Sequence, residues 1–250
     1  MNLSLSIEYI CQTDLNIYDS PSCNRLATQA KVGRYLKVLP ESEEMAISVR
    51  LVEDNYPGWL LKDDLKSLVQ AEVAYQAIAL SPQEIQNKLP EIIAFTQNAM
   101  QQPNCYLWGG TLGPNYDCSG LMQAAFAASG IWIPRDAYQQ EAFLEKITFE
   151  ELQPGDFVFF GNAEKATHVG LYLGNNCYIH SSGEKSGRNG IGIDELSERG
   201  DEISKNYYQQ LRGFGRVMRG WGIDVDRQDD VDRQDACPTG LGKNENNQLY

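Results

Sequence analysis

One short segment restricts the fold of this chain more than any other, residues 115–120 with the sequence NYDCSG. It follows a loop rich in glycine, proline and asparagine, and an apolar run with helical spacing continues from it to Gly130. This pattern predicts a helix whose first turn carries Cys118. Free backbone N–H groups and the positive end of the helix dipole favour a thiolate at that position, so we expect Cys118 to be reactive.

The chain has only two histidines, His168 and His180, and each lies in a strand-like run. Residues 174–176 (GNN) join the two runs. A three-residue hairpin loop would pair Leu173 with Cys177 and place both imidazoles on one face of the sheet, whereas a two-residue loop would place them on opposite faces. We predict the three-residue loop. A cysteine with two neighbouring histidines can supply a nucleophile, a base and an orienting group.

Charge and composition narrow the classes of partner. The formal net charge is -13 and the isoelectric point is about 4.6, which predicts neither a nucleic acid nor an anionic membrane as partner. No run approaches the ~20 apolar residues that a membrane span needs, and the first eight residues lack the basic start of a signal peptide. The six cysteines form no C-x-x-C pair, so we expect reduced thiols and a cytoplasmic protein.

We predict two domains, with residues 1–72 forming a small β-barrel. Its short β-rich runs lie at 7–11, 15–18, 35–39 and 46–52. Helical spacing covers 71–80 and 82–100, and Ser81-Pro82 supplies an N-cap and a first turn. We take 73–89 as a linker and 90–222 as the second domain. Beyond it the sequence DVDRQD occurs twice in tandem at 224–235, and so polar a repeat predicts a disordered tail over 223–250.

Five short motifs occur in the second domain. In chain order they are YxWGG at 106–110, DCSG at 117–120, PGD at 154–156, HVG at 168–170 and IHS at 179–181. With these motifs the second domain resembles the NlpC/P60 family of papain-like cysteine peptidases. In the first domain, LNI at 15–17 and YPGWL at 56–60 resemble a bacterial SH3-like domain. The whole chain resembles the cyanobacterial γ-D-glutamyl-L-diamino acid endopeptidases of this family.

The resemblance implies an α+β protein, with an N-terminal SH3-like β-barrel followed by a papain-like domain of helices packed on an antiparallel sheet. It also implies that Cys118 is the nucleophile, His168 the general base and acid, and His180 the group that orients His168. The Cys118 N–H and the Tyr106 hydroxyl are then the candidate oxyanion donors. Tyr106 as an ordinary core residue is the alternative. We expect no cofactor and no metal.

The substrate that the resemblance implies is a murein peptide with a free N-terminal L-alanine. The bond cleaved joins D-glutamate to meso-diaminopimelate or lysine, and the reaction would serve peptidoglycan turnover and recycling. The expected substrate-binding residues are Tyr56, Asp117, Ser119, Arg135 and Asp136. Asp136 matches a carboxylate that binds the amine, and Tyr56 would reach it from the first domain. For Arg135, an ion pair with Asp136, a contact with the D-glutamyl carboxylate and a surface salt bridge are all open.

Three other interpretations compete with the peptidase. One cysteine, two histidines and nearby aspartates can ligate zinc, although neither an H-E-x-x-H helix nor paired cysteines are present. A Cys-His amidase or acyltransferase of related fold would use the same three residues. A non-catalytic cell-wall-binding protein would use only the SH3-like domain. The oligomeric state and the preferred diamino acid are not specified by the sequence.

Overall fold

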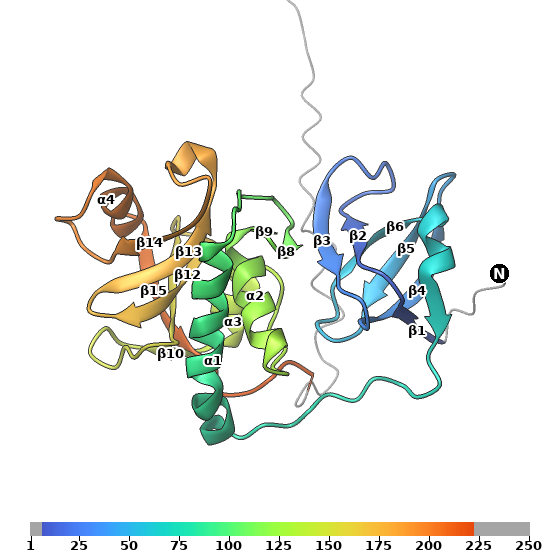
Figure 1. Ribbon diagram of the computed structural model, residues 1–250, viewed down its shortest axis with the longest axis horizontal. Coiled ribbons are helices and arrows are strands. Elements are labelled where there is room, and N and C mark those ends of the chain that lie inside the picture. The colour runs from blue at the N-terminus through green and yellow to red at the C-terminus, as the bar shows by residue number, and fades with distance from the viewer. Residues whose placement is uncertain (1–6, 223–250) are drawn as a thin grey trace, which may run out of the picture.

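The computed structural model describes residues 7–222, and within them a β-rich domain precedes a larger domain of helices and strands (Figure 1). The tail predicted over 223–250 lies outside the described residues. No helix in the described part of the chain is long and apolar enough to cross a membrane. The expected class, an α+β protein with a β-rich domain in front, is confirmed.

The first domain is one antiparallel sheet in the order β3-β2-β6-β5-β4-β1-β7. Its strands are β1 (Glu8–Cys11), β2 (Leu15–Tyr18), β3 (Leu26–Ala30), β4 (Tyr35–Ser42), β5 (Ala46–Leu51), β6 (Pro57–Leu61) and β7 (Leu68–Gln70), with the 3-10 turn η1 (Lys62–Ser67) before β7. Buried positions alternate along the strands, so one face of the sheet supplies a core that includes Ile17, Leu36 and Leu60. The four predicted β-rich runs coincide with β1, β2, β4 and β5.

Helix α1 (Pro82–Gln101) begins inside the stretch 73–89 that the sequence suggested as a linker. Ser81 fixes this start, because its hydroxyl accepts from the Glu84 N–H while the Glu84 carboxylate accepts from the Ser81 N–H at 2.8 Å. Residues 71–80, which we take as a linker despite their helical spacing, contain no helix or strand. Their apolar side chains Val73 and Ile78 are exposed, and without a buried face so short a helix is not stable.

The second domain is built on a six-stranded antiparallel sheet in the order β10-β15-β11-β12-β13-β14. The remaining elements are β8 (Thr111–Leu112), β9 (Asn115–Tyr116), α2 (Cys118–Ala128), α3 (Ala137–Phe143), β10 (Glu145–Ile147), β11 (Phe157–Gly161), β12 (Ala166–Gly174), β13 (Cys177–Ser182), η2 (Glu184–Ser186), β14 (Gly190–Glu195), α4 (Glu202–Tyr208) and β15 (Leu211–Arg216). Helix α2 ends just before Gly130, as predicted, and Gly130 has a left-handed φ of 79°.

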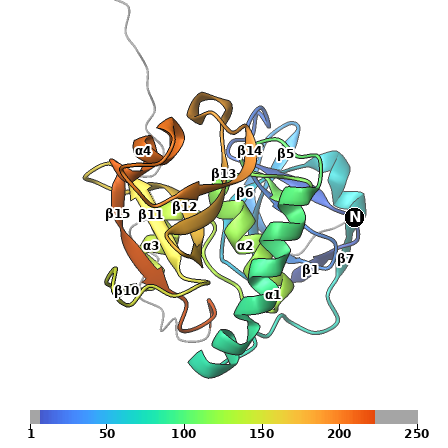
Figure 2. The same cartoon turned by 60° about the vertical axis from the view of Figure 1, so that its left-hand side comes forward.

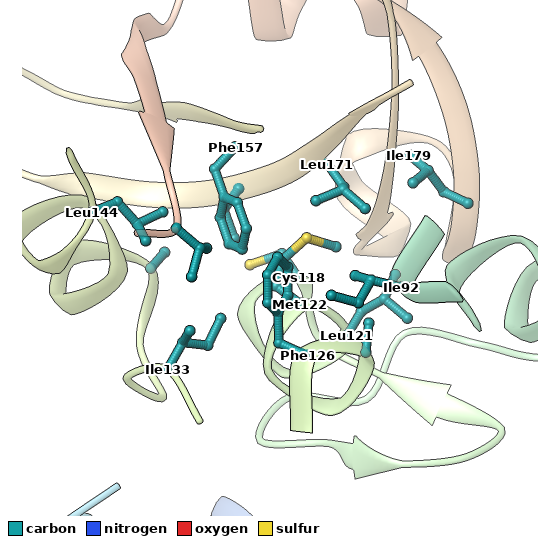
Figure 3. Packing of buried hydrophobic residues seen from close by; sticks show 14 of the residues in the cluster. Ile92, Cys118, Leu121, Met122, Phe126, Ile133, Leu144, Phe157, Leu171 and Ile179 are labelled. Atoms are coloured by element: carbon teal, nitrogen blue, oxygen red, sulfur yellow. The ribbon is translucent and has the colours of Figure 1, made fainter. Parts of the chain in front are cut away.

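Helices cover both faces of this sheet (Figures 1 and 2). Along β11, Phe157 and Phe159 pack toward α1 and α2, while Val158 and Phe160 pack toward Tyr207 of α4. Cys118 belongs to the first of these cores, where Met122, Phe126, Phe157 and Leu171 also lie (Figure 3). The core thus fixes the start of α2 against the central strands of the sheet.

Candidate active site

The first turn of α2 carries Cys118, and the neighbouring glycines allow the chain to pass close to it. Asp117 is the N-cap, and its Oδ1 accepts from the Gly120 N–H at 2.6 Å. A Cβ on Gly120 would lie 2.0 Å from the carbonyl oxygen of Gly110. The glycines at 109, 110 and 120 therefore hold the loop 106–110 directly over the start of the helix.

The Cys118 thiol is buried, and burial raises its pKa to about 12. The charge of Asp117 acts in the same direction, whereas hydrogen bonds from the backbone N–H groups of Val169 and Ser119 lower the pKa. The sequence suggested that the helix start would favour a thiolate, but desolvation outweighs that effect in the folded protein. The contact with Val169 places the sulfur against β12, next to His168.

The hairpin between β12 and β13 differs from the prediction in its loop. The turn consists of two residues, Asn175 and Asn176, which have positive φ angles of 52° and 58°, and Gly174 pairs with Cys177. The three-residue loop is therefore wrong. An irregularity between Tyr172 and Gly174 restores the expected pairing, with Leu171 opposite Ile179.

His168 and His180 lie on the same face of the sheet, as predicted, with 2.6 Å between His168 Nε2 and His180 Nδ1. On its other side the His168 ring stacks on Tyr207 of α4, with 4.4 Å between the ring centroids. These contacts leave Nδ1 as the ring nitrogen of His168 that is available to a thiol.

Behind His180 lies Asp194 of β14, whose Oδ2 is 2.6 Å from His180 Nε2. Arg188 pairs with the other carboxylate oxygen of Asp194 and also with Asp201 at 2.9 Å. A carboxylate only accepts hydrogen bonds, so His180 must carry its proton on Nε2 and accept at Nδ1. His168 then donates from Nε2 and keeps the lone pair on Nδ1.

The protonation states fit this chain of hydrogen bonds. Burial lowers the pKa of His168 well below its ordinary value, and the neighbouring His180 adds to the effect. Burial also lowers the pKa of His180, against the opposing influence of Asp194. For Asp194, burial alone would raise the pKa, but hydrogen bonds from His180 and Arg188 outweigh it and hold the pKa well below its usual range. The resting site therefore holds a neutral thiol, two neutral imidazoles and a carboxylate.

A groove of about 440 Å³ opens beside His168. Its lining comes from the loop 106–110, from β12, from the segment after β13 and from α4. The residues are Tyr106, Trp108, Thr167, His168, Gly183, Lys185, Ser186, Asn206, Tyr207 and Gln210. Tyr106 is half-buried, and burial, with Cys118 next, raises the pKa of its phenol. Its hydroxyl therefore stays protonated and can donate a hydrogen bond near the sulfur.

Arg135 is fully buried, so the surface salt bridge that the sequence left open is excluded. Its guanidinium donates to Asp117 Oδ2 at 2.6 Å, to Ser119 Oγ at 2.9 Å and to Thr28 Oγ1 in the first domain at 3.0 Å. Asp117 and Ser119 are likewise buried, and both accept hydrogen bonds from Arg135. These three side chains thus hold the start of α2 and connect it to the first domain.

Tyr56 and Asp136 meet across the domain boundary, as the sequence suggested. The Tyr56 hydroxyl lies 3.3 Å from Asp136 Oδ1 and 3.4 Å from Oδ2. Burial raises the pKa of both side chains. Two further contacts join the domains nearby, from Gln123 Nε2 to Asp54 Oδ2 at 2.8 Å and from Thr111 Oγ1 to the Gln29 carbonyl at 3.0 Å. The first domain therefore forms one wall beside the start of α2.

The sequence did not indicate Asp194, Arg188 or Tyr207. Asp194 lies in the run GIGIDE, which has no motif character, and only the pairing of β13 with β14, where Tyr178 faces Asp194, brings it to His180.

Among the described residues no group of three or more His, Cys, Asp or Glu side chains is arranged to hold a metal ion.

Comparison with known proteins agrees with this arrangement. Residues 103–212 match the NlpC/P60 family, and residues 17–65 match the bacterial dipeptidyl-peptidase SH3 domain. The chain carries an NlpC/P60 domain behind a bacterial SH3 domain. The first match includes Cys118, His168, His180 and Asp194, and the second includes Tyr56.

Two curated relatives and one solved structure illustrate the similarity. The "Probable endopeptidase p60" of Listeria seeligeri is 39% identical over 112 residues, which are 45% of this chain and 19% of that protein. The "Gamma-D-glutamyl-L-lysine dipeptidyl-peptidase" of Bacillus subtilis (strain 168) is 42% identical over 79 residues, which are 30% of this chain and 27% of that protein. The chain thus spans about a fifth to a quarter of these relatives. A crystal structure of an NlpC/P60 family protein from Bacillus cereus ATCC 10987 covers 85% of this chain and 64% of its own, with 22% identity and a TM-score of 0.47. The cyanobacterial resemblance stays a prediction.

Proposed function

We propose that this protein is a cysteine endopeptidase that hydrolyses the γ-D-glutamyl-L-diamino acid bond of murein peptides with a free N-terminal L-alanine. The observation that carries the proposal is the hydrogen-bonded chain of His168, His180 and Asp194 beside a cysteine at a helix start. The names of the Listeria and Bacillus relatives, an endopeptidase and a γ-D-glutamyl-L-lysine peptidase, support the same class of reaction.

The first chemical step is transfer of the Cys118 proton to His168 Nδ1 as the sulfur attacks the amide carbonyl. The Cys118 N–H and the Tyr106 hydroxyl donate to the oxyanion. The resulting imidazolium of His168 is stabilised through His180 by the negative charge of Asp194. His168 then gives its proton to the departing amine, and a water molecule activated by the same imidazole hydrolyses the thioester.

The amine of L-alanine is the group that Asp136 and Tyr56 would bind. Their oxygens converge at the domain boundary, so a carboxylate and a phenol can both accept from an ammonium. In intact peptidoglycan this nitrogen is acylated and carries no charge. A pocket of this kind therefore favours peptides already released from the glycan, which is the reason to propose a role in turnover and recycling.

The test is incubation of the purified protein with L-Ala-γ-D-Glu-meso-diaminopimelate and with its N-acetylated form, followed by mass spectrometry. We expect cleavage of the free tripeptide alone, and no cleavage by Cys118→Ala. Asp136→Asn and Tyr56→Ala should lower kcat/KM for the free tripeptide by more than tenfold. Equal cleavage of both peptides would support the peptidase activity but would contradict the binding of a free amine by Asp136 and Tyr56.

The competing functions give different results in the same assay. An acyltransferase would transfer the acyl group to an added amino acid faster than to water. An amidase, like a peptidase, would transfer it to water, but it would cleave a simple γ-D-glutamyl amide in preference to the tripeptide. A cell-wall-binding protein would leave both tripeptides intact.

A further inference from the structure

The groove beside His168 lies on the side of the site from which the product amine departs. His168 must stand next to that amine to protonate it, and His168 lines the groove. The Tyr56–Asp136 pair, at the domain boundary, is not among the lining residues. If that pair holds the N-terminal L-alanine, the groove receives the residue on the other side of the cleaved bond, which is the diamino acid.

The lining of the groove is positively charged, although the chain as a whole is acidic. The protein has 34 Asp and Glu residues and 21 Lys and Arg residues. In contrast, no Asp or Glu lines the groove, and Lys185 is the only Lys or Arg among its lining residues. Lys185 lies in η2, is exposed, and makes no ion pair with another described residue. Its ammonium is therefore free to meet a charged group of the ligand.

We propose that Lys185 selects the diamino acid and that it favours meso-diaminopimelate over lysine. This inference rests on the proposed peptidase function. The side chain of diaminopimelate ends in a carboxylate and an amine, whereas that of lysine ends in an amine alone. Lys185 attracts the distal carboxylate of diaminopimelate and repels the ammonium of lysine. The hydroxyl and amide groups of Ser186, Asn206 and Gln210 supply hydrogen-bonding partners for the rest of this end.

The experiment compares kcat/KM for L-Ala-γ-D-Glu-meso-diaminopimelate and L-Ala-γ-D-Glu-L-Lys in the wild type, Lys185→Met and Lys185→Glu. We expect the wild type to favour diaminopimelate, and Lys185→Met to reduce the ratio of the two values about fivefold, the size of an exposed charge pair. Lys185→Glu should reduce the ratio further and raise kcat/KM for the lysine peptide. Lys205→Met is the matched control, because Lys205 is an exposed lysine of α4 that does not line the groove.

The outcomes separate this inference from the proposed function. A ratio that is the same in wild type and in both Lys185 variants overturns the selection by Lys185. An equal loss on both substrates also overturns it, because the charge would then meet the α-carboxylate that the two peptides share. A change of similar size in Lys205→Met would mean that the effect is one of net charge. Failure to cleave either tripeptide at all would instead contradict the peptidase.

Discussion

Asp194 decides which nitrogen of each active-site histidine carries the proton. Because its carboxylate accepts from His180 Nε2, the proton of His168 must lie on Nε2 and the lone pair on Nδ1. The arrangement also supplies the negative charge that stabilises an imidazolium at His168. Arg188 holds the other oxygen of the carboxylate and limits its rotation. Asp194 therefore positions His168, the proposed general base, through His180.

Replacing Asp194 with asparagine should lower kcat by about 10²- to 10⁴-fold. An amide can present its NH₂ group to His180 Nε2, which would reverse the tautomers and direct a proton of His168 at the thiol. The acidic limb of the pH profile of kcat/KM should also change, because Asp194 no longer favours the protonated imidazole. Asp201→Asn is the control, since Asp201 contacts Arg188 but neither histidine, and it should stay within about threefold of wild type. An unaltered pH profile in Asp194→Asn would contradict the positioning role.

Tyr106→Phe tests the second oxyanion donor. Removing such a donor costs about 3 kcal/mol in other enzymes, which corresponds to about 100-fold in kcat. The change should act on kcat more than on KM, because the hydroxyl binds the charge that develops in the transition state. Fixed-time assays at a saturating concentration of the tripeptide measure kcat. A kcat within twofold of wild type would mean that Tyr106 is only a wall of the groove.

At this scale the sequence indicated Cys118 and both histidines as the candidate catalytic residues, but it did not indicate the residues that support them. Cys118, His168 and His180 stand in recognisable motifs next to turn and strand signals. Asp194 depends on the register of β14 against β13 across the intervening stretch 183–189, which the sequence leaves unspecified. Arg135 was recognised as a candidate, but its burial against Thr28, 107 residues earlier, follows only from tertiary packing.

Among the elements, the first turn of α2 is held by close backbone contacts. Gly120→Ala would place a methyl group 2.0 Å from the Gly110 carbonyl oxygen, so the loop or the helix start must move. A displacement of about 1 Å at the nucleophile costs on the order of 100-fold in rate, and we expect that loss in kcat/KM. The control is Ala127→Gly near the other end of α2, which should cost about 1 kcal/mol of stability and leave activity at 25 °C unchanged. Activity of Gly120→Ala close to wild type would show that the loop yields without moving Cys118.

The boundaries of helices and strands were predicted correctly where a local sequence signal sets them. Helix α1 begins where Ser81, Pro82 and Glu84 predicted it, because a capping box is a local signal. The hairpin loop differs from the prediction because Asn175 and Asn176 alone form a tight turn with positive φ. The register then shifts by one residue between Tyr172 and Gly174 in β12. Residues 71–80 have helical spacing but no surface to pack on, and such a surface is not encoded locally.

At the scale of the whole molecule, the two domains share one polar boundary. Arg34 stacks on Trp132 with its guanidinium carbon 4.4 Å from the ring centroid, and it pairs with Asp54, which also accepts from Gln123. These groups come from positions 34, 54, 123 and 132, so no short motif predicts their contact. Two domains and their order could be predicted from the sequence, whereas the way in which they meet could not.

The pH dependence of stability follows from buried groups in the second domain. The pKa values of His168 and His180 are lowered from the ordinary 6.5, so below pH 6.5 the unfolded chain binds protons that the folded chain does not. Stability should then fall on acidification by up to about 1.4 kcal/mol per pH unit for each histidine. The pKa of the Cys118 thiol is raised from 9.0 to about 12, so above pH 9 the folded chain keeps a proton that the unfolded chain has lost, and stability should fall as the pH rises.

We therefore expect maximal stability between about pH 6.5 and 9, measured as the free energy of unfolding in urea at intervals from pH 5 to pH 10. His168→Gln should flatten the acidic side, because one of the two histidines no longer takes up a proton on unfolding. Cys118→Ser should flatten the alkaline side in part, because Cys11, whose pKa burial also raises to about 12, still contributes there. The lowered pKa of Asp194 acts in a separate range, since its contribution is lost only below its ordinary value of 3.8.

The buried carboxyl groups of Glu53 and Asp136 have raised pKa values and act in the opposite direction to the histidines. A stability that rises from pH 7 to pH 5 in the wild type but not in His168→Gln would mean that His168 is charged in the folded protein and that the resting site is not neutral.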